Sequence, residues 1–255
     1  MTFPRPYSTR RLGKVLVRLI CPALFPMVLT ATGVAQDQTD PEKWLQEAEA
    51  AYCGVTNYTA IFHKQQRVDG ELLQEESILI KFRNPFSLYM RWVAVPYKGC
   101  EVLYVQGWNA NRARVHRGGL FRFITWDLDP KHPRLMAGNL RPLTDTGLGF
   151  LVKRVAVNVR KAVKAGEFSC YQRGEETVCG RQTRTLEVVF PKDRAKGYEV
   201  YRMIINQDLA SKLLVRMRAY DWDNELFENY GYEDLKLNAG LTDADFDPGH
   251  PDYRF

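Results

Sequence analysis

Residues 70–107, GELLQEESILIKFRNPFSLYMRWVAVPYKGCEVLYVQG, contain the three short runs that decide the fold. Hydrophobic and polar residues alternate in the first run, 78–83, and again after Pro85 in the second, 86–92. Side chains of a β-strand point to opposite faces with a period of two, so each run predicts one apolar and one mixed face. The connections, which contain Pro and Gly, are too short for a parallel crossover. The stretch therefore predicts an antiparallel meander with a large apolar face.

The rest of the chain predicts further strands and two helices. Asp40 followed by Pro41 is typical of a helix start, and we expect this helix over 41–53. A second helix is expected over 144–164, where hydrophobic residues recur at helical spacing among basic ones. About ten or eleven strands are expected in all, the first over 57–68. Several Gly and Pro residues in 107–143 indicate an ordered excursion rather than a helix.

The first 35 residues are typical of a secretory signal peptide. Basic residues precede a short apolar run, 19–30, and Gly33-Val34-Ala35 follows as a small-x-small cleavage pattern. The apolar run is too short, and too interrupted by Pro, for a membrane span. We expect cleavage near Ala35 and a periplasmic location. By length the remaining residues, 36–255, fit one all-β domain or two small ones, and we expect a single domain. An uncleaved anchor or a disordered tail is the alternative.

The positive charge of the chain belongs mostly to this leader. The whole chain has 36 Lys and Arg against 30 Asp and Glu, a net charge of +6. The leader contains five of the basic residues and no acidic ones, so the remainder has 31 basic and 30 acidic residues. A nucleic-acid-binding protein needs a clustered basic surface in its folded domain. The composition therefore gives no support for a nucleic-acid partner.

Cysteine pairing is open in three ways for the four cysteines after the leader, Cys53, Cys100, Cys170 and Cys179. A two-residue turn at Gly174-Glu175 places Cys170 opposite Cys179 on a non-hydrogen-bonded pair, where Cα atoms lie about 4.5 Å apart. That separation suits a disulfide. We therefore expect a Cys170–Cys179 bridge and leave a Cys53–Cys100 bridge open. The alternative is that all four are small buried hydrophobic residues.

Catalytic and metal-binding signatures are missing from the sequence. It has no nucleophile elbow, no phosphate-binding glycine loop, no CxxC pair and no dinucleotide fingerprint. Its four histidines have no second His or Cys at metal-ligand spacing. We therefore expect no enzyme activity, no metal and no cofactor.

Three segments together resemble a known family. YTAIFHKQQRVDGEL (58–72) leads into IKFRNPFSLYMRW (80–92), and FENYGYEDLKLNAGLTDADFDP (227–248) lies near the C-terminus. This pattern resembles the LolA and LolB lipoprotein-carrier superfamily, in particular an uncharacterised branch of exported bacterial proteins catalogued as a domain of unknown function. The resemblance implies a mostly β, α+β fold: an open, strongly curved antiparallel half-barrel with helices on its concave side.

The resemblance also implies a function and a site. Such proteins carry lipid or lipoprotein acyl chains, and an arginine before the proline of one turn helps to close a lid; here the nearest match is Arg83, with Asn84 between it and Pro85. We expect the apolar face to line a lipid-binding cavity, with part of the second helix as its lid. The cavity residues are Ile78, Ile80, Phe82, Phe86, Leu88, Met90, Trp92 and Tyr104, and the lid residues are Arg83, Leu148, Leu151 and Val155. Alternatively, these side chains pack solidly and leave no room.

Three functions therefore compete at this point. The first is periplasmic binding or carriage of a lipid or lipoprotein acyl chain, with a membrane surface or a membrane-bound donor or acceptor as further partner. The second is a non-enzymatic sensor or protein-interaction module on the same scaffold. The third is an enzyme, which would require polar residues with perturbed pKa values gathered in one cleft.

Overall fold

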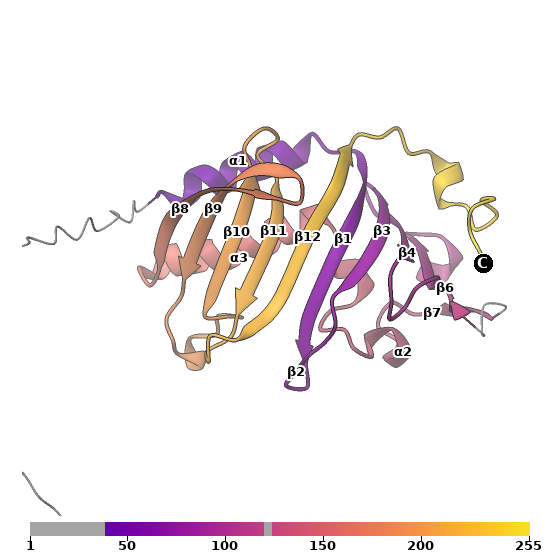
Figure 1. Cartoon of the computed structure of the whole chain (residues 1–255), viewed down its shortest axis with the longest axis horizontal. Coiled ribbons are helices and arrows are strands. Elements are labelled where there is room, and N and C mark those ends of the chain that lie inside the picture. The colour runs from indigo at the N-terminus through magenta and orange to yellow at the C-terminus, as the bar shows by residue number, and fades with distance from the viewer. Residues whose placement is uncertain (1–38, 120–123) are drawn as a thin grey trace, which may run out of the picture. The chain divides into compact units, whose positions relative to one another are not determined.

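The sheet of this protein is antiparallel and open. The computed structural model describes residues 39–119 and 124–255, so the predicted signal peptide and its cleavage site lie outside the described residues. Within these residues twelve strands form one sheet in the order β7-β6-β5-β4-β3-β1-β12-β11-β10-β9-β8, with β2 paired to β1 (Figure 1). The strands are β1 (Asn57–Val68), β2 (Glu71–Leu72), β3 (Glu76–Arg83), β4 (Ser87–Trp92), β5 (Glu101–Val105), β6 (Ala113–His116), β7 (Thr125–Leu128), β8 (Ser169–Val178), β9 (Arg181–Val189), β10 (Arg202–Asp208), β11 (Leu214–Tyr220) and β12 (Leu226–Leu237).

The helices lie on one face of this sheet, which we call the inner face (Figure 1). They are α1 (Pro41–Cys53), α2 (Pro133–Met136) and α3 (Leu148–Ala165). Arg160 of α3 binds Glu42 and Glu49 of α1 at 2.7 and 2.6 Å, which joins the two long helices. The predicted α+β half-barrel with helices on one side is confirmed, and the strand count is slightly higher than expected.

The central meander has the alternation that the sequence predicted. In β3 every second residue is buried, and the inward residues include Ile78 and Ile80. β1 lies between β3 and β12, and its inward residues continue the same face. The sheet thus joins the two halves of the chain through β1 and β12, which come from its opposite ends.

Much of the predicted cavity is filled by the chain itself. Ile78, Ile80 and Leu88 are fully buried, and so are Leu148 and Val155 of α3. These side chains form one continuous hydrophobic core. Because these side chains pack into that core, the predicted open cavity is wrong for this part of the inner face.

Helix α3 begins later than predicted because of Gly147. This residue has φ +105° and ψ 167°, a backbone conformation that residues other than glycine rarely adopt. The break separates a short 3₁₀ turn, Leu143–Asp145, from the helix proper. The Leu148 N–H then donates to the Tyr58 hydroxyl at 3.1 Å, which attaches the start of α3 to β1.

The predicted Cys170–Cys179 disulfide is wrong. β8 continues through Gly174-Glu175, and the chain turns at Cys179 and Gly180, which have φ of 51° and 72°. Cys170 therefore pairs with Val188, and about 30 Å of strand separates it from Cys179. All four described cysteines are free.

The C-terminal tail packs on the outer face of the sheet. Phe246 and Tyr253 form a second small core there with Tyr89 of β4, and the Tyr89 and Tyr253 rings stack at 3.8 Å. Arg83 binds Asp243 of this tail at 2.7 Å and lies over the Phe246 ring. The placement of Arg83 in a lid is therefore wrong: because side chains alternate along β3, it points away from the inner face.

Candidate functional site

The segment 133–147, which we call the cover segment, connects β7 to α3 and crosses part of the inner face. It contains α2 and the 3₁₀ turn before Gly147. Two polar contacts attach it to β1: the Lys64 ammonium donates to the Asn139 side-chain oxygen at 2.5 Å, and the Leu140 N–H donates to Gln66 at 3.2 Å. The ordered excursion predicted for 107–143 is confirmed, but the expectation that it contains no helix is wrong, because α2 begins at Pro133.

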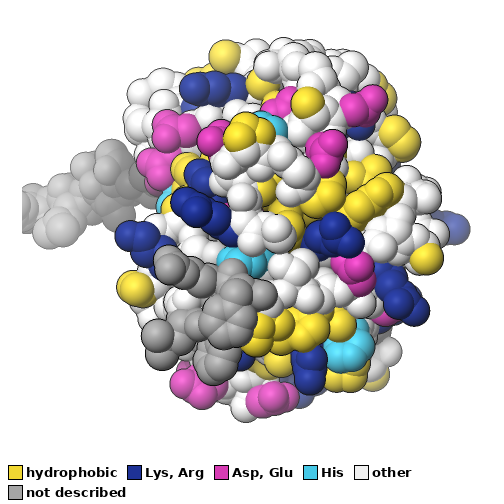
Figure 2. Space-filling model, turned by 90° about the vertical axis from the view of Figure 1, so that its right-hand side faces the viewer, with side chains coloured by type: hydrophobic (Ala, Val, Ile, Leu, Met, Phe, Trp, Pro, Cys, Tyr) yellow, Lys and Arg dark blue, Asp and Glu magenta, His cyan; other side chains and the backbone are white. Residues whose placement is uncertain are grey.

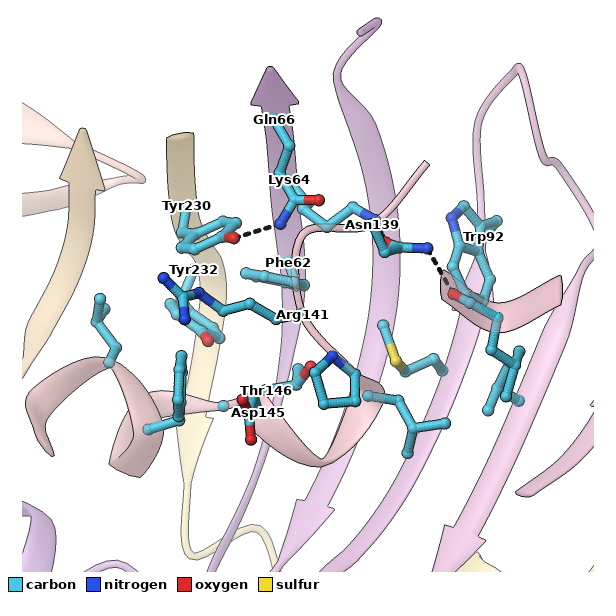
Figure 3. A pocket seen from close by; sticks show the side chains of 18 residues that line it. Phe62, Lys64, Gln66, Trp92, Asn139, Arg141, Asp145, Thr146, Tyr230 and Tyr232 are labelled. Atoms are coloured by element: carbon cyan, nitrogen blue, oxygen red, sulfur yellow. Dashed lines mark hydrogen bonds between the residues drawn. The ribbon is translucent and has the colours of Figure 1, made fainter. Parts of the chain in front are cut away.

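Beneath the cover segment lies a small cleft, which we call the inner cleft (Figure 3). Its volume is about 90 Å³. Aromatic side chains from β1, β4 and β12 form much of its wall, with the cover segment opposite. The lining residues are Phe62, Lys64, Gln66, Met90, Trp92, Val102, Leu135, Asn139, Arg141, Pro142, Leu143, Asp145, Thr146, Gly147, Phe150, Leu151, Tyr230 and Tyr232. Sites for drug-sized ligands measure about 300–1,000 Å³, so the inner cleft alone is too small for a lipid chain.

One wall of the inner cleft is polar and buried. Lys64 and Glu76 are both less than a tenth exposed and form an ion pair at 2.9 Å. The Trp92 indole N–H donates to the other oxygen of Glu76 at 2.5 Å. On the adjacent side Gln66 donates to the Tyr230 hydroxyl (Figure 3). This hydroxyl in turn donates to Glu228 at 3.1 Å. The inner face is therefore not uniformly apolar, and its buried charges are paired as burial requires.

Four charged side chains continue this polar wall toward the edge of α3. Arg154 and Glu228 are almost fully buried and form an ion pair, and Arg141 lies 3.4 Å from Glu228. Both arginines also bind one oxygen of Glu199, each at 2.8 Å. Burial by itself raises the pKa of Glu199, but the two guanidinium groups outweigh it and lower the pKa below its ordinary value. The cluster therefore consists of two guanidinium groups and two carboxylates.

A second, larger space, which we call the outer groove, lies between the β3–β4 turn and α3. Its volume is about 570 Å³, within the range of small-molecule sites. Its lining combines apolar side chains, such as Phe82 and Phe86, with charged ones that include Arg141, Lys153 and Arg154. Its lining residues are Tyr52, Phe82, Asn84, Pro85, Phe86, Arg141, Thr144, Asp145, Thr146, Gly149, Phe150, Lys153, Arg154, Val157, Asn158 and Glu199.

The end of the cover segment and the start of α3 separate the inner cleft from the outer groove. Arg141, Asp145, Thr146 and Phe150 line both spaces. This stretch includes the conformational break at Gly147. A displacement of these residues would therefore join the two spaces.

The predicted cavity residues divide between these spaces and the core. Phe82 and Phe86 line the outer groove, whereas Met90 and Trp92 line the inner cleft together with Leu151 of the predicted lid. Those that line neither space are Ile78, Ile80, Leu88, Tyr104, Leu148 and Val155.

The sequence analysis did not predict the buried polar residues, although the sequence contains one relevant pattern. Lys64 and Gln66 follow Phe62 at a spacing of two, which places all three on one face of β1. The pattern assigns the face but does not show that a charge on it is buried.

Hydrophobic side chains are also exposed at the end of the sheet where β6 and β7 lie, in patches between charged ones (Figure 2). The loop between β4 and β5 contains Val95 and Tyr97, which are 66% and 48% exposed. This loop follows Trp92, so the wall of the inner cleft continues into an exposed apolar loop.

Searches of the described residues for two other kinds of site found nothing. No three His, Cys, Asp or Glu side chains in the described part of the chain are arranged to hold a metal ion. Within the same residues, no helix combines the length and the hydropathy needed to cross a membrane.

A family comparison supports the sequence-based resemblance. The model of a family described as "Protein of unknown function (DUF1571)" matches residues 55–255. The chain belongs to the DUF1571 family. The matched residues include the strands that line both spaces, so the site belongs to the DUF1571 region itself. The expected membership of a family of unknown function is confirmed, and no curated protein matches the chain.

Solved structures with a similar arrangement include the following three proteins. The Mycobacterium tuberculosis lipoprotein LppX is 15% identical, with a TM-score of 0.49 over 82% of this chain and 100% of that one. A chain of the Pseudomonas aeruginosa MucA/MucB complex is 17% identical, with a TM-score of 0.46 over 83% of this chain and 62% of that one. A LolA superfamily protein from Nitrosomonas europaea is 9% identical, with a TM-score of 0.34 over 82% and 98%.

These likenesses concern the fold of the DUF1571 chain alone. The chain spans less than two thirds of the MucB chain, 62%, so that protein contains more than this fold. A LolA superfamily protein is among the similar structures.

Proposed function

We propose that the protein is exported to the periplasm and there binds and carries a lipid-like chain, such as the acyl chain of a lipid or lipoprotein. The main support for the proposal is the outer groove of about 570 Å³. Its wall contains Phe82 and Phe86, and cationic side chains also line it. A groove that is apolar in one part and charged in another suits an amphipathic ligand. The signal-peptide pattern of the first 35 residues supports export.

The energy available from such binding is sufficient. Burying one CH₂ group is worth about 0.8 kcal/mol, so a sixteen-carbon chain offers roughly 12 kcal/mol before ordering costs. An open groove covers only part of the chain, which reduces this figure by about half. A remainder of about 6 kcal/mol corresponds to a Kd of roughly 40 μM, which ordering costs weaken further, as suits a carrier that must release its cargo.

The shared wall sets how deeply a ligand can enter. Met90 and Trp92 lie on the far side of Arg141 and Phe150 from the outer groove. A chain in the outer groove would reach them only when the end of the cover segment moves. We therefore place the ligand first along Phe82 and Phe86.

Two measurements test this function. Native mass spectrometry of protein purified from its host should show a bound lipid, and purified protein should take up a fluorescent long-chain fatty acid. Phe86→Asp puts a charge in the apolar part of the groove and should lower the affinity about tenfold or more, equivalent to at least 1.4 kcal/mol.

The matched control is Phe227→Asp. Phe227 is also half-buried against the main core, but it lines neither the inner cleft nor the outer groove. Its variant should keep the affinity within about twofold, a change of some 0.4 kcal/mol. The absence of bound lipid together with the absence of fatty-acid uptake would refute the proposed function.

A further inference from the structure

Glu199 is a side chain of the outer groove that bridges two arginines. Its carboxylate accepts from the Arg141 Nη2 and from the Arg154 Nε through one and the same oxygen, each at 2.8 Å. We propose that Glu199 occupies the binding place of an oxyanion, and that the head group of the ligand is a carboxylate or phosphate that replaces it. This inference rests on the proposed function and specifies the class of lipid.

The two carboxylates of the cluster differ in a way that assigns them different roles. Glu228 is fully buried and binds the inner side of both arginines. Glu199, by contrast, has a side chain that is 42% exposed and lines the outer groove. Removing Glu228 would leave buried charge unpaired, whereas moving Glu199 exposes the arginines to the groove. Glu199 is therefore the carboxylate that a ligand can replace.

The backbone position of Glu199 allows this exchange. The residue lies between β9 (Arg181–Val189) and β10 (Arg202–Asp208), outside regular secondary structure. Arg154, in contrast, is fixed within α3, and its side chain is only 3% exposed. Arg154 is thus held more firmly than the anion that binds it.

The arginines also offer more donors than Glu199 uses. A guanidinium group presents five N–H donors, and bidentate binding of carboxylate or phosphate is its strongest mode. The Arg154 Nη2 has no hydrogen-bond partner among the described residues. An oxyanion with both oxygens available would use donors that the single bridging oxygen of Glu199 leaves unused.

The cationic pair lies at a suitable distance from the apolar wall. The Arg141 guanidinium is 5.6 Å from the centre of the Phe150 ring, and both residues line the outer groove. Lys153 adds a further positive charge to the same groove. A ligand with its head group at Arg141 would therefore have its chain beside Phe150 and Phe86.

The test compares a fluorescent long-chain fatty acid with its methyl ester, which has the same chain without the charge. Glu199→Gln removes the competing charge and should raise the affinity for the acid at least threefold, with the affinity for the ester unchanged. Arg141→Gln should lower the affinity for the acid at least fivefold and again leave the ester unchanged. The control is Arg202→Gln, because Arg202 pairs with Glu187 and lines neither space.

The experiment also uses inorganic phosphate as a competitor and a phosphate-bearing lysophospholipid as a third ligand. The wild-type protein serves as the reference. Competition of phosphate against the acid but not against the ester supports an oxyanion site, and tighter binding of the lysophospholipid than of the acid identifies phosphate as the preferred group. Equal affinities for acid and ester in the wild type and both variants would overturn the inference while leaving the proposed function intact. Binding of neither ligand would overturn both.

Discussion

Replacing Gly147 with alanine should destabilise the protein by loosening the start of α3. Gly147 lines the inner cleft and has φ +105°, in a region that is essentially restricted to glycine. A Cβ atom at this position would lie 2.8 Å from the Tyr58 hydroxyl oxygen and 3.4 Å from the Phe82 ring. Both a strained backbone and a steric clash are therefore expected.

The expected change in the free energy of unfolding is the sum of the backbone strain and the steric clash. A residue held in such a conformation costs about 1–3 kcal/mol, and overpacking a well-packed core costs about 1–3 kcal/mol more. We expect Gly147→Ala to lower the free energy of unfolding by about 4 kcal/mol. That is a large part of the roughly 5–15 kcal/mol that stabilises a typical domain.

Gly174→Ala separates the two effects. Gly174 has φ +102°, but a Cβ atom there would meet nothing within 4 Å, so only the strain remains. Urea unfolding followed by circular dichroism gives both free energies. With a denaturant slope of about 3 kcal/mol per molar, the urea midpoint of Gly147→Ala should fall by roughly 1.3 M. A shift no larger than that of Gly174→Ala would refute the steric contact between Gly147 and Tyr58.

Three further predictions concern other parts of the molecule. Glu228→Gln leaves buried positive charge without its partner and should lower the free energy of unfolding in urea by about 3–5 kcal/mol; an unchanged midpoint would contradict the buried ion pair. Burial raises the pKa of Asp245, but hydrogen bonds from Lys81 and the backbone outweigh it and lower the pKa below 3.8, so this stabilisation is present above pH 3.8 and is lost as the pH falls further. Asp245→Asn should therefore remove part of the acid sensitivity of unfolding, and an identical pH profile would count against the contact. Alkylation of unfolded, unreduced protein should label both Cys170 and Cys179, and a peptide linking them would show that the strand register is wrong.

Local patterns predicted the parts of the fold that depend on neighbouring residues. The cap at Asp40 and the proline after it mark the start of α1, and β1 has the predicted bounds Asn57–Val68. The start of α3 was placed too early because helical spacing continues across Gly147, and only its positive φ shows the break. The pattern of the neighbouring residues does not predict which backbone conformation a glycine adopts.

The turn after β8 is a second feature that the sequence pattern did not predict correctly. Glycine is present both at Gly174 and at Gly180, and the sequence prediction chose the first. The structure turns at Cys179-Gly180, where both residues have positive φ. Such turns usually have Asn or Asp before the glycine, so a cysteine there gave little signal.

Only part of the site could be predicted, because a local pattern identifies inward-facing residues but not their partners. Alternation identified Phe82, Phe86 and Trp92 as inward-facing, and these residues line the outer groove or the inner cleft. The partners of Glu228 could not be predicted, because Arg141 and Arg154 lie far from it in the sequence, in the cover segment and in α3. The Lys64–Glu76 pair depends on the register of β1 with β3, which places the two residues opposite each other.

The proposed function places a lipid chain in the outer groove. A photoreactive fatty acid, cross-linked to the protein under light and mapped by peptide mass spectrometry, tests it directly. We predict modified residues within the β3–β4 turn around Phe86 and at the start of α3 around Phe150, with less labelling when unlabelled fatty acid competes. Labelling confined to the outer face of the sheet, for example near Tyr253, would contradict the account.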